Sequence, residues 1–248
     1  MLALHCTMAF GGAWAGFAKH TGEQVKLIAP DMASHGASAD WDMHSDYADT
    51  VLAGSLAAMD DAPMDIVGHS FGGATALRIA VMYPERVRSL TVIEPVLFCA
   101  GAARDPAAIE AYDKVAQPFH QAAEAGDWET AAREFNSQWS DVAPPWDKVP
   151  ERTRAAMVRA VPVVQDTRAF LYEDTAGLLQ PGGLDAMQVP TVIMRGELAH
   201  PAVIATNDAL AQIMPNAVQS VITGAGHMAP ISHPKLVAEV VLDLLARS

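Results

Sequence analysis

The sequence is poor in cysteine, and this excludes two classes of scaffold. Cys6 and Cys99 are the only cysteines among 248 residues, too few and too far apart for a disulfide framework. No spacing of Cys and His resembles a zinc site, so we expect no metal. No motif calls for a cofactor, and none is expected.

Positive charge and long apolar runs are scarce as well. The chain carries 16 Lys and Arg against 29 Asp and Glu, a formal net charge of −13. Nucleic acids and anionic membranes bind basic faces, so neither is expected as a partner. No segment is apolar for long enough to span a bilayer, and residues 1–5 lack the basic start and apolar run of a signal peptide. These features predict a cytoplasmic protein that acts on a small molecule, as a monomer or a homodimer.

The chain does contain a regular alternation of short apolar segments with helical ones. This pattern predicts an α/β fold with a mostly or wholly parallel sheet covered by helices on both faces. Six strands are predicted, at 1–4, 25–29, 64–67, 89–93, 191–194 and 219–222. Helices are predicted near 13–22, 45–60, 73–82, 201–213 and 234–246.

One long segment, residues 100–185, interrupts this alternation. It holds several helical patches and no convincing strand, with helices predicted at 106–125, 127–139, 151–159 and 166–179. A helical insertion between two strands of a sheet is typical of a lid over an active site, and a separate helical domain is the alternative. We favour the lid because the segment has too little core of its own. The predicted core domain is then 1–99 together with 186–248.

A single serine lies where a strand turns directly into a helix. The apolar strand 65–67 ends in Gly68-His69-Ser70-Phe71-Gly72, and the helical run 74–80 follows. Such a turn strains the serine backbone and lifts its hydroxyl clear of the sheet. The helix that follows directs its N-terminal amides at the same place. We interpret Ser70 as a nucleophile; the alternative is an idle serine in a glycine-rich turn.

A serine hydroxyl needs a base, and His227 is the candidate. It lies in Gly224-Ala225-Gly226-His227, after the last strand and before the last helix. The carboxyl ends of parallel strands share one edge of a sheet, so His227 should lie near Ser70. His233 is the rival, but its place at a helix start suits capping better. His69 is expected only to pack beside the nucleophile.

The oxyanion that forms during acyl transfer needs backbone donors. His5-Cys6-Thr7-Met8 leaves the first strand at the same edge as Ser70. The N–H of Phe71, together with that of Thr7 or Met8, would form the oxyanion hole. The alternative is an ordinary strand-to-helix loop.

Four sequence blocks together resemble the α/β-hydrolase superfamily. They follow the family's order and span the chain apart from the predicted lid: His5-Cys6, Asp31-Met32-Ala33-Ser34-His35-Gly36-Ala37-Ser38, Gly68-His69-Ser70-Phe71-Gly72-Gly73 and Gly224-Ala225-Gly226-His227. The resemblance implies an α/β-hydrolase fold whose first two strands are absent here. It also implies that His35 belongs to a structural loop near the site. One departure is that Cys6 stands where the family commonly has glycine.

The third member of the triad departs from the family's commonest position. The acid often follows the penultimate strand as Gly-x-x-Asp, but this chain has Gly196-Glu197-Leu198-Ala199 there. Some members, haloalkane dehalogenases among them, carry the acid one strand earlier. Glu94 ends the strand 89–93 and would emerge at the catalytic edge, so we predict that it is the acid. Glu197 is the alternative.

These residues predict a serine hydrolase that cleaves an ester or related acyl bond, as a carboxylic ester hydrolase does. Lactonase, carbon–carbon bond hydrolase and haloperoxidase or perhydrolase activities use the same triad in this family and remain open. A ligand-binding member without catalysis is a less favoured reading, supported only by Ala199. Trp139 and Trp146 of the lid are predicted to line the substrate pocket, and a mostly apolar lining would favour uncharged acyl esters.

Overall fold

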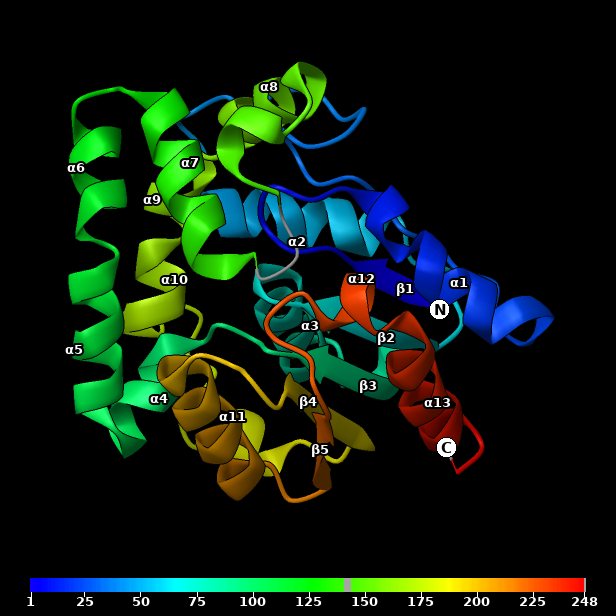
Figure 1. Cartoon of the computed structure of the whole chain (residues 1–248). Helices are drawn as coiled ribbons and strands as arrows, with labels where there is room; N and C mark the ends of the chain where they lie inside the picture. Colours follow the sequence, from blue (N-terminus) through cyan, green and yellow to red (C-terminus); the bar gives the residue numbers. More distant parts are fainter. Residues whose placement is uncertain (141–143, 248) are drawn as a thin grey trace.

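A five-stranded parallel sheet forms the centre of the molecule, with helices on both faces (Figure 1). The computed structural model describes residues 1–140 and 144–247. The strands lie side by side in chain order: β1 (Leu2–Leu4), β2 (Met64–His69), β3 (Val87–Ile93), β4 (Thr191–Gly196) and β5 (Ala217–Ile222). Parallel strands need crossover connections, and the helices supply them.

Alternate residues along the strands face two separate cores. On one face Ala3, Val67 and Val192 pack with residues of α1 (Ala15–Thr21) and α13 (Pro234–Leu245). On the other face Leu2, Ile66, Leu90 and Ile193 pack against three helices, α2 (Tyr47–Ala57), α3 (Phe71–Met82) and α11 (Pro201–Ile213). The central strands are buried on both faces, which explains their near-continuous apolar sequence.

The sixth predicted strand, residues 25–29, is reduced to a single bridge. Ile28 pairs in parallel with Leu2, its N–H donating to Met1 O at 2.9 Å and its carbonyl accepting from Ala3 N at 2.8 Å. Among the described residues the sheet thus has five strands where about six were predicted, and the sixth segment lies beside β1. The neighbouring strand β1 has only three residues, which leaves little backbone to pair with.

The segment between β3 and β4 is helical, and its helices stand together on one side of the molecule (left in Figure 1). They are α4 (Phe98–Arg104), α5 (Pro106–Val115), α6 (Gln117–Glu124), α7 (Trp128–Trp139), α8 (Glu151–Ala160), α9 (Val163–Asp166) and α10 (Arg168–Glu173). Asp105 and Asp127 cap α5 and α7 by accepting backbone N–H groups, as short acidic side chains commonly do.

Two of the predicted helices in this segment are shorter than expected. The helix predicted at 106–125 is split into α5 and α6, and Pro118 lies in the first turn of α6, where a missing N–H costs nothing. The helix predicted at 166–179 ends at Glu173, because Asp174 takes a left-handed conformation. The carboxylate of Asp174 accepts the N–H groups of Leu178 and Leu179. The division into a core and a lid remains a prediction, and its ranges include residues 141–143 and 248, outside the described residues.

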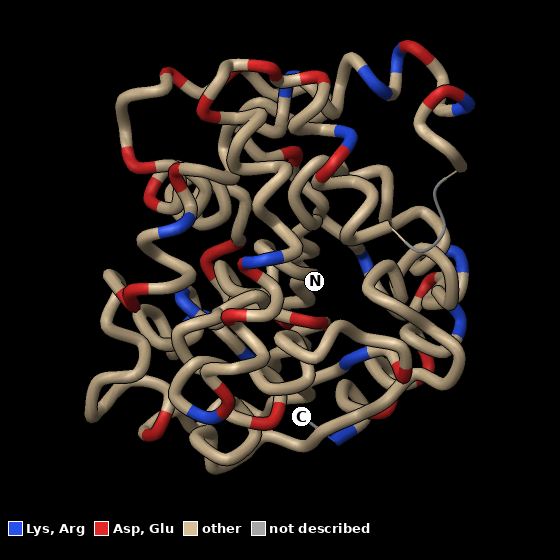
Figure 2. The backbone as a smooth tube through the Cα atoms, turned by 60° about the vertical axis from the view of Figure 1, so that its left-hand side comes forward, with Lys and Arg blue, Asp and Glu red and all other residues tan. Residues whose placement is uncertain are grey.

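Charged side chains of both signs are spread over the molecule. Figure 2 shows Lys and Arg scattered among the more numerous Asp and Glu. In the part of the chain that the structure describes, no helix combines the length and the apolar character needed to cross a membrane.

Candidate active site

Ser70 occupies the corner between β2 and α3 with a strained backbone. Its φ and ψ are 56° and −119°, a region that non-glycine residues rarely adopt. Its N–H donates to Ile93 O of the neighbouring strand at 2.9 Å, which anchors the corner. Met8 and Glu94 also have positive φ values, 62° and 47°. Three of the six non-glycine residues with positive φ that the structure describes therefore lie at loops where the sequence predicted catalytic groups.

Two glycines of the motif are required by close packing. A Cβ atom on Gly68 would lie 2.3 Å from Gly72 O, and one on Gly72 would lie 2.4 Å from Leu4 O. Both contacts are with backbone, which cannot move aside cheaply. The helix therefore begins close to β2 and β1, and its first residue, Phe71, lines the cavity above the site.

The predicted base and acid lie in direct contact. His227 Nδ1 is 2.6 Å from Glu94 Oε2, and both side chains are buried. The other oxygen of Glu94 accepts the N–H of Gly196 at 2.7 Å. This second bond holds the carboxylate in one orientation. In the neutral ring, an Nδ1–H donated to Glu94 leaves Nε2 without a proton, which is the tautomer a general base needs.

The alternative acid, Glu197, has a different role in the structure. Its side chain is exposed, and its Oε2 accepts the N–H of Gly224 at 2.8 Å. Glu197 therefore braces the loop that carries His227 without contacting the imidazole. This placement favours Glu94.

The two candidate loop donors of the oxyanion hole differ in availability. The N–H of Met8 donates to His35 Nε2 at 3.0 Å, so it is already engaged. Thr7 lines the cavity together with Ser70 and Phe71. Of the two, Thr7 is thus the better candidate to act with the N–H of Phe71. His35 keeps the structural place that the sequence implied.

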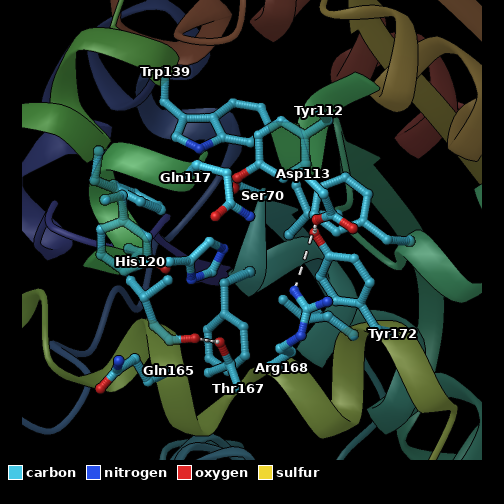
Figure 3. Close-up of a pocket in the computed structure, with 18 of the residues that line it drawn as sticks. Ser70, Tyr112, Asp113, Gln117, His120, Trp139, Gln165, Thr167, Arg168 and Tyr172 are labelled. Carbon is cyan, nitrogen blue, oxygen red and sulfur yellow. Dashed lines mark hydrogen bonds and ion pairs between the residues drawn. The ribbon is translucent and has the colours of Figure 1, made fainter. Parts of the chain in front are cut away.

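A cavity of about 490 Å³ opens above Ser70, between the sheet and the helices of the lid segment (Figure 3). Trp139 lines the cavity and also packs against the candidate base, because its ring centroid lies 4.5 Å from that of His227. The ring centroid of Tyr112 lies 5.1 Å from that of Trp139, and Tyr112 also lines the cavity. Trp146, the other predicted pocket residue, does not line this cavity. It packs instead with the separate core of the lid helices, so that expectation is corrected.

The cavity is more polar than the sequence suggested. Besides two tyrosines, its lining contains seven polar or charged side chains from the lid segment: Asp113, Gln117, His120, Glu124, Gln165, Thr167 and Arg168. Arg168 lies 3.7 Å from Asp113 and stacks over the Tyr172 ring at 4.1 Å (Figure 3). Sequence reasoning missed these residues because nothing in a helical repeat tells which face of a lid helix meets the site. The mostly apolar lining from which a preference for uncharged esters was expected is therefore not present, so that preference needs a different basis.

The comparisons with known proteins identify the family of the chain. A family model described as the alpha/beta hydrolase family matches residues 1–240. The chain belongs to the alpha/beta hydrolase family. Lipase LipV of Mycobacterium tuberculosis is 31% identical over 148 residues, which cover 58% of this chain and 53% of LipV. The chain thus spans about half the length of that relative.

Two further matches extend along nearly the whole of this chain. The 2-hydroxy-6-oxo-6-(2′-aminophenyl)hexa-2,4-dienoic acid hydrolase of Metapseudomonas resinovorans is 24% identical over 95% of this chain and 79% of that protein. The structure of the 2-hydroxy-6-oxo-6-phenylhexa-2,4-dienoate hydrolase of Rhodococcus sp. strain RHA1 aligns with a TM-score of 0.75 at 18% identity, covering 99% of this chain and 89% of that one. At this identity the structural match supports the fold. The chain is therefore a hydrolase-family protein with lipase and dienoic acid hydrolase relatives.

Three buried histidines of this protein should make its stability sensitive to acid. Burial lowers the pKa of His5, and burial with the nearby His5 lowers that of His35 to about 3. Burial also lowers the pKa of His69. The Nε2 atoms of His5 and His35 accept backbone N–H groups, so both rings must be neutral in the fold.

We therefore expect the free energy of unfolding to fall as the pH drops from about 6.5 toward 5. In this window the unfolded chain binds protons that the folded chain excludes, at up to about 1.4 kcal/mol per pH unit for each histidine. Urea unfolding at several pH values measures the slope. His35→Gln should reduce it, whereas His44→Gln, at an exposed position, should not. A flat profile between pH 7 and 5 would contradict the prediction.

Proposed function

We propose that this protein is a serine hydrolase that cleaves an ester or related acyl bond of a small to medium molecule through an acyl-enzyme intermediate. The observation that carries the proposal is the 2.6 Å contact of His227 Nδ1 with Glu94, at the same strand edge as the strained Ser70 corner. A nucleophile, a base and an orienting acid from three separate loops are the parts that activated-serine chemistry requires.

The proposed reaction has two halves. Ser70 Oγ attacks the carbonyl carbon while His227 Nε2 takes its proton, and the carbonyl oxygen becomes an oxyanion held by the N–H groups of Phe71 and Thr7. His227 then gives the proton to the leaving group, and the acyl-enzyme forms. A water molecule, deprotonated by the same histidine, releases the acid and restores Ser70. Glu94 stabilises the imidazolium in both halves.

The cavity supports a substrate of limited size. A volume of about 490 Å³ lies within the usual range for small-molecule sites, roughly 300–1,000 Å³. Arg168 is already paired with Asp113, which leaves no unbalanced positive charge to hold an acid. This balance favours a neutral ester over a carboxylate.

A fluorophosphonate probe tests the proposal directly, because only an activated serine reacts with it at a useful rate. We expect stoichiometric labelling at Ser70, located by peptide mass spectrometry, together with turnover of 4-nitrophenyl esters of short acids. The Ser70→Ala protein should not label. Absence of labelling in the unmodified protein would instead support a ligand-binding member without catalysis.

A second candidate is hydrolysis of a dienoic acid. It is favoured by the relative from Metapseudomonas resinovorans, which aligns along 95% of this chain. Parallel measurement of kcat/KM on that relative's named substrate and on 4-nitrophenyl butanoate separates the two. A preference for the dienoic acid by more than about tenfold would replace the ester proposal.

A further inference from the structure

The residue before the candidate nucleophile is bonded to the backbone of the candidate base. His69 ends β2, and its side chain is buried. Its Nε2–H donates to the carbonyl oxygen of His227 at 2.9 Å, across 158 positions of the chain. The two imidazole rings lie 4.9 Å apart. Simple packing beside Ser70, the role expected from the sequence, does not need such a bond.

We propose that His69 is a positioning residue that holds the main chain of His227 in register with Ser70. This inference rests on the proposed function, since it assigns His69 a role in the same triad. His227 lies on the loop between β5 and α12 (Ala229–Ser232), where no ladder of strand bonds fixes the backbone. Glu94 holds the ring of His227, and His69 holds its carbonyl. The two anchors fix opposite ends of one residue.

The anchors also tie the base to the nucleophile through adjacent strand ends. His69 directly precedes Ser70, whose N–H bonds Ile93 O, and Ile93 directly precedes Glu94. The two residues that contact His227, His69 and Glu94, are therefore the sequence neighbours of the two residues joined by this hydrogen bond. A catalytic base must lie within hydrogen-bond reach of the proton it takes, and a displacement of about 1 Å can cost about a hundredfold in rate.

Histidine suits this position better than a charged donor would. Burial and the neighbouring His227 keep the pKa of His69 well below its ordinary value, so the ring remains neutral when His227 becomes an imidazolium. The charged groups that act on it come from His227 and, more weakly, His5. A lysine or arginine here would place a second positive charge beside the base. The neutral ring supplies the donor without that repulsion.

The test compares variants that keep or remove the donor. His69→Gln retains an N–H that can reach the carbonyl, while His69→Leu and His69→Phe remove it with an aliphatic and a ring-shaped replacement. We expect kcat to fall by about ten- to a hundredfold in the two variants without a donor. KM should change little, and the glutamine variant should recover most of the rate. His233→Gln, at the rejected candidate base, is the matched control and should remain near the unmodified rate.

The pH–rate profile separates positioning from a general packing defect. Without the anchor the Glu94–His227 contact loosens and stabilises the imidazolium less, so the acid limb of kcat/KM should move to lower pH in His69→Leu and His69→Phe. Thermal unfolding identifies the variants that fold. Equal losses in the glutamine variant and a folded donor-free variant, or unchanged kcat in the latter, overturn the proposal.

Fluorophosphonate labelling distinguishes this failure from failure of the proposed function. If Ser70 does not label in the unmodified protein, the serine-hydrolase proposal fails and the role of His69 fails with it. If Ser70 labels normally and the folded donor-free variants label and turn over at the same rates, only the role of His69 is wrong. If His69→Leu does not fold, the kcat values of His69→Phe and His69→Gln are compared instead.

Discussion

Replacing Ser70 with alanine should lower kcat by about a million-fold while the protein remains folded. In related chemistry the loss of a triad nucleophile leaves only the catalysis supplied by substrate binding and the oxyanion hole. The side chain is small and lies at the floor of a cavity, so its removal leaves no gap in the packed core. Steady-state hydrolysis of 4-nitrophenyl esters, with thermal unfolding as the folding check, measures the effect.

Ser55→Ala provides the matched control for this substitution. Ser55 is also buried, but its hydroxyl donates to Val51 O within α2, away from the cavity lining. It should retain full kcat. Residual turnover in Ser70→Ala above about one per cent of the unmodified rate would assign the nucleophile to another residue.

Most of the candidate triad follows from the order of strands and loops in the sequence. The carboxyl ends of parallel strands meet at one edge, so Ser70, Glu94 and the loop after β5 that carries His227 lie at the same edge. Glu94 directly follows β3 and Ser70 directly follows β2. Their neighbours pair in the sheet, with His69 opposite Ile93. The contact of Glu94 with His227 is a consequence of this register and of the glycine-rich approach to His227.

Other features depend on contacts between distant segments and could not be read from local pattern. The N–H of Met8 is taken by His35, 27 residues away, and that bond decides which loop amide remains available. The bond from His69 to the His227 carbonyl spans 158 positions. The place of Trp139 in the cavity lining depends on how α7 packs in the folded chain. No local pattern separates it from Trp146, which packs with the core of the lid helices.

Glu94→Gln should lower kcat by about ten-thousandfold. An amide cannot stabilise an imidazolium, and it can turn its NH₂ group toward Nδ1, which would force the ring into the wrong tautomer. The substitution is nearly isosteric, and the amide oxygen can still accept the N–H of Gly196. The fold should therefore persist, and the loss should appear in kcat with little change in KM.

The matched control for this variant is Glu197→Gln, in the loop where the family commonly places its acid. Glu197 is exposed and accepts the N–H of Gly224, a bond that an amide oxygen can also accept. This variant should lose less than about threefold in kcat, because it keeps the bond to Gly224. Even complete loss of that bond would cost only about 0.5–1.5 kcal/mol of stability. The reverse order of losses would transfer the acid to the later loop, and the Glu94–His227 contact would then be a structural ion pair. Equal, small losses in both variants would instead remove the acid from the proposed mechanism, because a buried carboxylate on the base would then contribute nothing to the rate.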